Sequence, residues 1–245
     1  PIGLLGYLVV RAVASRSIPL AGFIKDFYRS SFQREPILAR TGLILLGLGG
    51  LSLVLAAVDP TVVDDTRVWL KPFKFYLSIG IYMFTIAWLL GDISAYLSDK
   101  YIRFFVWYSV AMAAGELGII TLQAARGVRS HYNTDSTLDI ALYGVMGLLI
   151  FINMFVVAHF GSHWWRNQKR LHRHYWLGGM YGIGVFTITG LLACVMSSQP
   201  WSRIGLYDSH TLVPLFGWNN AGGDLRISHF LGIHALQMMP ILGWY

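Results

Sequence analysis

Charged side chains inside long apolar runs are the feature of this sequence with the clearest potential for chemistry. Lys71 and Lys74 begin one run, Glu116 interrupts the next, and Asp139 begins a third. An ionisable group within a membrane span is expensive, and it normally faces a partner, a ligand or a water-filled cavity. At 100° per residue, the two lysines share one helix stripe with Ser78. These side chains are therefore candidates for a ligand site or an ion pathway.

The last apolar run carries a second polar group that includes two histidines. Arg226, His229, His234 and Gln237 occupy one arc of the expected helix. Neutral imidazole is a common ligand of haem iron, so His131, His229 and His234 are the candidates for a haem or metal site. The sequence does not identify a cofactor; b-type haem is the one that we consider possible. The full set of ligand or pathway candidates is Lys71, Lys74, Glu116, Gln123, Arg126, His131, Asp139, Asp224, Arg226, His229, His234 and Gln237.

A further histidine group follows the fourth apolar run. His159 and His163 are four residues apart and share a helix face, and His172 and His174 come shortly after them. Two imidazoles at this spacing can bind a metal ion. The sequence favours the alternative, a solvated basic loop next to Arg166.

Composition indicates lipid as the main solvent. Of the 245 residues, 55% are hydrophobic and 13% are charged, whereas about a quarter of a soluble domain is charged. The net charge of +7 would fit a nucleic-acid partner, but the basic residues lie between the apolar runs, where they determine topology. We therefore expect a lipid bilayer and no nucleic acid as partner. Cys194 is the single cysteine, which excludes an internal disulfide.

Six apolar segments predict an all-α, polytopic bundle of transmembrane helices. Each is close to the roughly 20 residues that cross about 30 Å of hydrocarbon. In the first, Gly47, Gly49 and Gly50 predict the close approach of another helix. The expected spans are 41–58, 72–91, 104–125, 139–158, 175–196 and 227–245.

Residues 1–40 form a separate basic segment ahead of the expected transmembrane domain, residues 41–245. Within it, Ser17–Phe32 mixes apolar and charged residues and predicts an amphipathic helix on the membrane surface, with a simple linker as the alternative. The chain starts without methionine and stops inside an apolar run, so we expect further residues beyond both ends.

Lysine and arginine predict the orientation. The segments outside the spans that contain the most lysine and arginine are the N-terminal segment, the second-to-third loop and the fourth-to-fifth loop. With six spans, all three lie on the same side of the membrane. This side should be cytoplasmic, which places the N-terminus in the cytoplasm. The costly polar residues of the second, third, fourth and sixth spans then lie mainly near the outer surface.

Three stretches resemble segments of uncharacterised bacterial multi-pass membrane proteins. They are Trp69–Phe75 (WLKPFKF), Arg126–Asn133 (RGVRSHYN) and Gly223–Phe230 (GDLRISHF). The resemblance implies a bacterial inner membrane, and it implies no activity for any residue.

Several functions are compatible with these features. The first is a non-catalytic membrane subunit, packed with other subunits in a larger complex, that binds a lipid, pigment, haem or quinone at the outer polar cluster. The second is a redox protein with b-type haem. The third is a small transporter or channel for an ion or anionic solute. Alternatively, Lys74, Glu116 and Asp139 only form structural ion pairs, and Lys71 and Arg226 extend to the lipid headgroups.

An enzyme is the least favoured class, with His131, Glu116 and Asp135 as conceivable proton-transfer groups. The sequence has no phosphate-binding loop, dinucleotide fingerprint, nucleophile elbow or His-Glu-x-x-His motif. We therefore assign no catalytic residue from the sequence.

Overall fold

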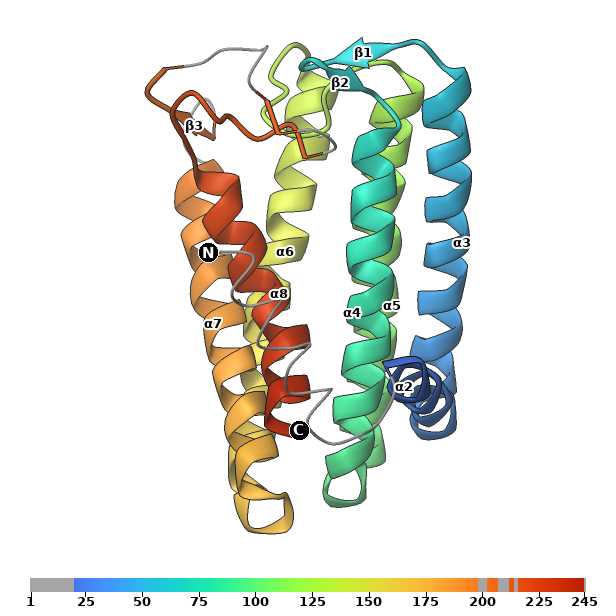
Figure 1. Ribbon diagram of the computed structural model, residues 1–245, viewed down its shortest axis with the longest axis vertical. Coiled ribbons are helices and arrows are strands. Elements are labelled where there is room, and N and C mark those ends of the chain that lie inside the picture. Colours follow the sequence, from blue (N-terminus) through green and yellow to red (C-terminus); the bar gives the residue numbers. More distant parts are fainter. Residues whose placement is uncertain (1–19, 198–201, 207–211, 214–215, 245) are drawn as a thin grey trace.

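The computed structural model describes residues 20–197, 202–206, 212–213 and 216–244, and these segments are all-α. The long helices run side by side along the longest axis of the molecule, as Figure 1 shows. The predicted helical fold class is therefore confirmed. The helices are α3 (Pro36–Val58), α4 (Leu70–Ile93), α5 (Asp99–Ala125), α6 (Thr137–Arg166), α7 (Arg173–Ser197) and α8 (Leu225–Trp244).

A shorter helix, α2 (Leu20–Arg34), lies across this bundle. In Figure 1 it is viewed nearly end-on, while the long helices run vertically. The Phe27 ring packs edge-on against Trp88 of α4, with centroids 5.4 Å apart. The sequence predicted a helix over Ser17–Phe32, of which residues 17–19 lie outside the described part of the chain.

Short hairpins and loops gather at one end of the bundle. Strand β1 (Val62–Val63) pairs with β2 (Thr66–Arg67), and β3 (Arg203–Ile204) pairs with β4 (Gly223–Asp224), both antiparallel. We call this the strand end; it comprises 59–69, 126–136 and the described residues of 202–224. The opposite end, the α2 end, holds α2 and the short 3-10 helices η1 (Ser94–Tyr96) and η2 (Gln168–Arg170).

Five helices, α3 to α7, are long and apolar enough to cross a membrane, with η1 continuing α4. They make this chain a multi-pass integral membrane protein. The sixth expected span corresponds to α8, a helix of 20 residues with Pro240 inside it, which is not among these five. The last residue of that span, Tyr245, lies outside the described part of the chain.

Polar caps explain why several helices are longer than the predicted spans. The Glu35 side chain caps α3 by accepting from the Ile37 amide, and Ser98 caps α5 by accepting from Tyr101. Ser136 caps α6 in the same way through the Asp139 amide. Hydropathy locates the part of a helix that lies in hydrocarbon, whereas caps locate its ends. Helix α3 consequently begins at Pro36 and includes the last residues of the basic segment 1–40.

Helix α3 approaches α4 through glycine. A Cβ atom on Gly49 would lie 3.2 Å from the Tyr76 Cβ, and one on Gly42 would lie 2.9 Å from the Gly80 carbonyl oxygen. Gly47 and Gly50 face open space. The predicted close approach is therefore present at Gly49 and absent at the other two, because those lie on the opposite face of α3.

The apolar core extends along the bundle and includes Leu117 and Met146 in the strand-end halves of α5 and α6. Its large aromatic side chains lie nearer the α2 end. Met83 and Leu89 of α4, Phe105 of α5, and Phe160 and Trp164 of α6 are all fully buried there. Phe105 and Phe160 stack with ring centroids 5.1 Å apart. Among the described residues, most of the buried charged and amide side chains lie toward the strand end.

Candidate functional site

A buried carboxyl group lies inside the bundle, in the half of α5 nearer the strand end. Glu116 of α5 is 2% exposed, and its Oε1 atom lies 4.0 Å from Nε2 of His131. Its Oε2 atom is buried without a hydrogen-bond partner. The Lys71 ammonium, in the first turn of α4, interacts electrostatically with this carboxyl. A buried carboxyl with one unused oxygen is costly unless another group satisfies it.

His131 lies in the α5–α6 loop and remains neutral at physiological pH. Burial, reinforced by the positive charges of Lys71 and His229, holds the pKa of His131 well below its ordinary value of 6.5. Its Nδ1 atom is 3.0 Å from the Ser130 hydroxyl, and its ring packs against Phe75 at 5.5 Å. The imidazole can therefore accept or donate a hydrogen bond without carrying a charge.

This lowered pKa predicts a loss of stability in mild acid. Below pH 6.5 the unfolded chain protonates His131, whereas the folded protein does not, so the free energy of unfolding falls as the pH falls. The slope from one such histidine is at most about 1.4 kcal/mol per pH unit. Unfolding measured from pH 7.5 to 5.5 should show a smaller decline for His131→Gln than for the natural chain. Identical declines would contradict a neutral, buried His131.

A second polar group connects α4 with α8. The Lys74 ammonium donates to the Phe216 carbonyl at 3.3 Å, and the Ser78 hydroxyl lies 3.1 Å from Nε2 of His234. His234 Nδ1 donates to the Phe230 carbonyl at 2.8 Å, so Nε2 accepts from Ser78 in the neutral ring. Both nitrogen atoms of His234 are thus in use.

Aromatic rings cover this second group. Phe216 and Trp218 stack with centroids 4.3 Å apart, and Phe230 packs edge-on against Trp218 at 5.4 Å. His234 lies 4.2 Å from the Phe230 ring. The four rings place an aromatic surface beside the Lys74 ammonium, which suits a planar or apolar ligand body.

Three of the predicted candidates form a closed network between α5 and α6. Asp139 accepts from Gln123 at 2.8 Å, from Arg126 at 2.6 Å and from Ser136 at 2.5 Å. Arg126 also donates to the Gln123 side-chain oxygen. Because each group is satisfied by another, Gln123, Arg126 and Asp139 fasten two helices together and offer little to a ligand.

Two further candidates form a second closed network. Arg226 binds Asp224 through Nε and Nη2, at 2.8 and 2.5 Å, and also donates to the Gly217 carbonyl at 2.8 Å. Burial raises the pKa of Asp224, but hydrogen bonds from Arg226 and from the Asn219 amide outweigh it and bring the pKa below its ordinary value. Arg226 is therefore held in an ion pair at the start of α8.

The remaining predicted strand-end residues are dispersed. Gln237 is buried two turns further along α8 than His229, and its amide nitrogen bonds the carbonyls of Ile233 and His234 of its own helix. Asp135 pairs loosely with Arg129 at 3.8 Å on the loop surface. The sequence also places Asp208 and His210, in the loop before the sixth expected span, near the outer surface; both lie outside the described part of the chain.

The histidines of the described segments form no cluster of three or more potential metal ligands, with one another or with Cys, Asp or Glu side chains. Both ring nitrogens of His234 already make hydrogen bonds. Of the three haem candidates, His131 and His229 are therefore the two that could bind iron. At the α2 end, His159 and His163 pack against each other at 4.9 Å, and His172 packs against His174 at 5.4 Å, as two separate pairs.

One ion pair at the α2 end has no counterpart among the predicted residues. Arg34 Nη1 lies 2.7 Å from Asp92 Oδ1, and the Tyr175 hydroxyl donates to Asp92 Oδ2 at 2.6 Å. Arg34 also donates to the Trp88 carbonyl at 2.8 Å. Helices α2, α4 and α7 meet here. In the sequence, only the position of Asp92 after Gly91, at the end of an apolar run, could have indicated this ion pair.

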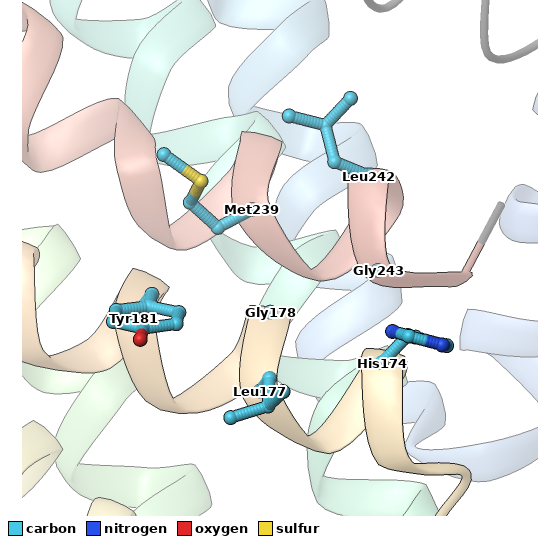
Figure 2. A pocket seen from close by; sticks show the side chains of 7 residues that line it. All are labelled: His174, Leu177, Gly178, Tyr181, Met239, Leu242 and Gly243. Carbon is cyan, nitrogen blue, oxygen red and sulfur yellow. The ribbon is translucent and has the colours of Figure 1, made fainter.

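A shallow groove of about 440 Å³ lies between α7 and α8 near the α2 end. Figure 2 shows its lining, in which Tyr181 and Met239 lie on facing helices and His174 lies at one end. None of the strand-end polar residues lines it. Because the groove is open and mostly apolar, lipid chains could fill it, so the strand-end group is the stronger candidate site.

Comparisons with models of protein families, with curated proteins and with solved structures find no match for this chain.

Proposed function

We propose that this chain is a non-catalytic subunit of a larger bacterial inner-membrane complex and that it binds a membrane-soluble ligand at the strand end. In this proposal α8 crosses the bilayer as a sixth span. Its 20 residues rise about 30 Å, the thickness of the hydrocarbon, and it packs closely along α7 from Gly232 to Gly243.

The orientation in this proposal follows the basic residues. The α2 end carries helix α2, the basic loop 167–172, and Lys100 and Arg103 in the first turns of α5, so in this proposal it faces the cytoplasm. Helix α2 lies across the bundle axis, as an amphipathic helix at the membrane surface does. The strand end then faces outward, where the ligand would enter from the outer leaflet.

The observation that carries the proposal is the unused oxygen of Glu116, which requires a donor. Lys71 and Lys74, which require acceptors, form no ion pair with a carboxylate in the described part of the chain. A quinol ring has hydroxyl groups on opposite sides, so one hydroxyl can donate to Glu116 while the oxygen of the other accepts from a lysine. The aromatic surface of Phe216 and Trp218 suits its planar ring.

Haem remains the second candidate ligand, because His131 is held in the neutral form that binds iron. With His234 fully bonded, His131 and His229 would be the axial ligands. A transport pathway has less support, because Met83, Phe105 and other fully buried side chains fill the half of the bundle below the site.

The binding test uses the protein in detergent with a short-chain ubiquinol, kept reduced, and follows the change in tryptophan fluorescence. Glu116→Gln and Lys74→Met should each weaken binding about tenfold, since each removes a charge-assisted hydrogen bond. Asp135→Asn, which neutralises an exposed carboxylate of the nearby loop, should bind as the natural chain does. Equal affinity in all four proteins would contradict this site.

Two measurements test the remaining parts of the proposal. An absorption spectrum of the purified chain should lack a Soret band if the ligand is a quinol, whereas a band lost in His229→Ala would establish haem instead. Cross-linking in native membranes followed by mass spectrometry should recover a stoichiometric protein partner. Recovery of the chain alone would contradict the subunit assignment.

A further inference from the structure

Helix α6 is longer than the hydrocarbon of a bilayer. Its 30 residues rise about 45 Å, against about 30 Å of hydrocarbon. With Asp139 at the outer boundary, the last two turns, His159–Arg166, reach the depth of the lipid headgroups. Side chains of these turns therefore lie where phosphate groups of the cytoplasmic leaflet would be found.

A compact polar cluster occupies this level between α5 and α6. The Tyr101 ring lies 5.3 Å from His159 and 4.6 Å from His163, centroid to centroid. The Tyr101 hydroxyl is buried and has no hydrogen-bond partner. Arg166, one turn after His163, interacts with it electrostatically. We call Tyr101, His159, His163 and Arg166 the headgroup cluster.

Positive charge surrounds this cluster without local compensation. Asp99 is the only acidic residue within 94–104 and 159–174. The Arg170 guanidinium lies 4.0 Å from the centre of the Tyr96 ring and so joins the two turns, which lie at the same end of the bundle in Figure 1. None of the following makes an ion pair with an acid of the described segments: Lys100, Arg103, Arg166, Lys169, Arg170 and Arg173.

Large aromatic side chains lie on the lipid-facing surface around the cluster. Phe104 and Trp107 of α5 and Trp165 of α6 are all more than half exposed. Aromatic rings of this kind favour the boundary between headgroups and acyl chains. The surface thus combines a basic, donor-rich cluster with an apolar rim, which matches the two parts of a phospholipid.

We propose that the headgroup cluster binds the phosphodiester of an anionic phospholipid of the cytoplasmic leaflet. The Tyr101 hydroxyl, the imidazole N–H groups and the Arg166 guanidinium donate to the phosphate oxygens, and the acyl chains lie along Phe104 and Trp107. Basic pockets between helices on the cytoplasmic side recognise such headgroups. A metal ion fits less well, because the cluster has two imidazoles and no carboxylate.

The test is native mass spectrometry of the full chain in detergent with added phosphatidylglycerol or phosphatidylcholine. The natural chain should retain phosphatidylglycerol and not phosphatidylcholine. Arg166→Gln should weaken retention about tenfold, and Tyr101→Phe, which removes only the unpaired hydroxyl, should weaken it several-fold. The matched control is Arg129→Gln, which removes one exposed arginine charge at the strand end and should leave retention unchanged.

Other outcomes would overturn the proposal. Equal retention of both lipids would exclude selection for an anionic headgroup, and equal losses in Arg166→Gln and Arg129→Gln would leave only a general effect of charge. If millimolar inorganic phosphate displaces the lipid completely, the cluster binds free phosphate, and the assignment of its ligand as a phospholipid is wrong. Failure of quinol binding at the strand end would not affect this result, because the two sites lie at opposite ends.

Discussion

Replacing Gly178 with alanine is expected to destabilise the protein by about 3 kcal/mol, the upper part of the range for overpacked cores. Helices α7 and α8 approach so closely that a Cβ atom on Gly178 would overlap the Met239 carbonyl oxygen. At Gly182 it would lie 2.9 Å from the Ala235 carbonyl oxygen. Because these obstacles are backbone atoms, no change of side-chain rotamer relieves the clash, and the helices must separate.

The same helix provides the control. A Cβ atom on Gly184 would meet nothing within 4 Å, so Gly184→Ala should be neutral or stabilise the protein by up to about 1 kcal/mol through helix propensity. Unfolding of both variants in mixed micelles containing SDS measures the difference. Equal stabilities would show that α7 and α8 do not make this backbone contact.

The second large effect is expected from Asp92→Ala, which should destabilise the protein by about 3 kcal/mol. Asp92 is mostly buried and holds both the Arg34 guanidinium and the Tyr175 hydroxyl. Its removal leaves a largely buried cation without a partner and separates α2 from α7. Asp92→Asn should lose less stability, because the amide oxygen still accepts one of the two hydrogen bonds.

Two comparisons isolate this effect. Asp135→Ala removes a carboxylate from an exposed pair at 3.8 Å and should change the free energy of unfolding by less than about 1 kcal/mol. In the double variant of Arg34→Met with Asp92→Ala, the loss should be smaller than the sum of the two single losses, because no unpaired charge remains. Strict additivity would mean that the ion pair contributes nothing.

The sequence predicted the helices well because an apolar run of about 20 residues has few alternatives in a bilayer. It located the polar stripe of α4 because Lys71, Lys74 and Ser78 recur at helical spacing. The sequence did not distinguish polar side chains that satisfy one another in closed networks from polar side chains that have few partners. Whether Arg126 is satisfied by Asp139, or Lys74 only by a carbonyl, depends on side-chain geometry between helices.

Contacts between distant segments were the least predictable. Arg34 and Asp92 are 58 positions apart in the chain, and neither shows its partner in its local sequence. The phenol of Tyr101 carries no sign in the sequence that it meets two histidines of another helix. Pairings of this kind follow from how helices rotate about their axes, which hydropathy alone does not determine.

The close contact between α7 and α8 divides the surface of α8 into two parts with different tolerance for sequence change. On the α7 side, glycine and backbone atoms meet, so almost any larger residue would displace the helix. On the opposite side, Phe230 and His234 reach the strand-end site through their side chains. Substitutions there can alter ligand preference while α8 keeps its place, so evolution can retune this site without rebuilding the fold.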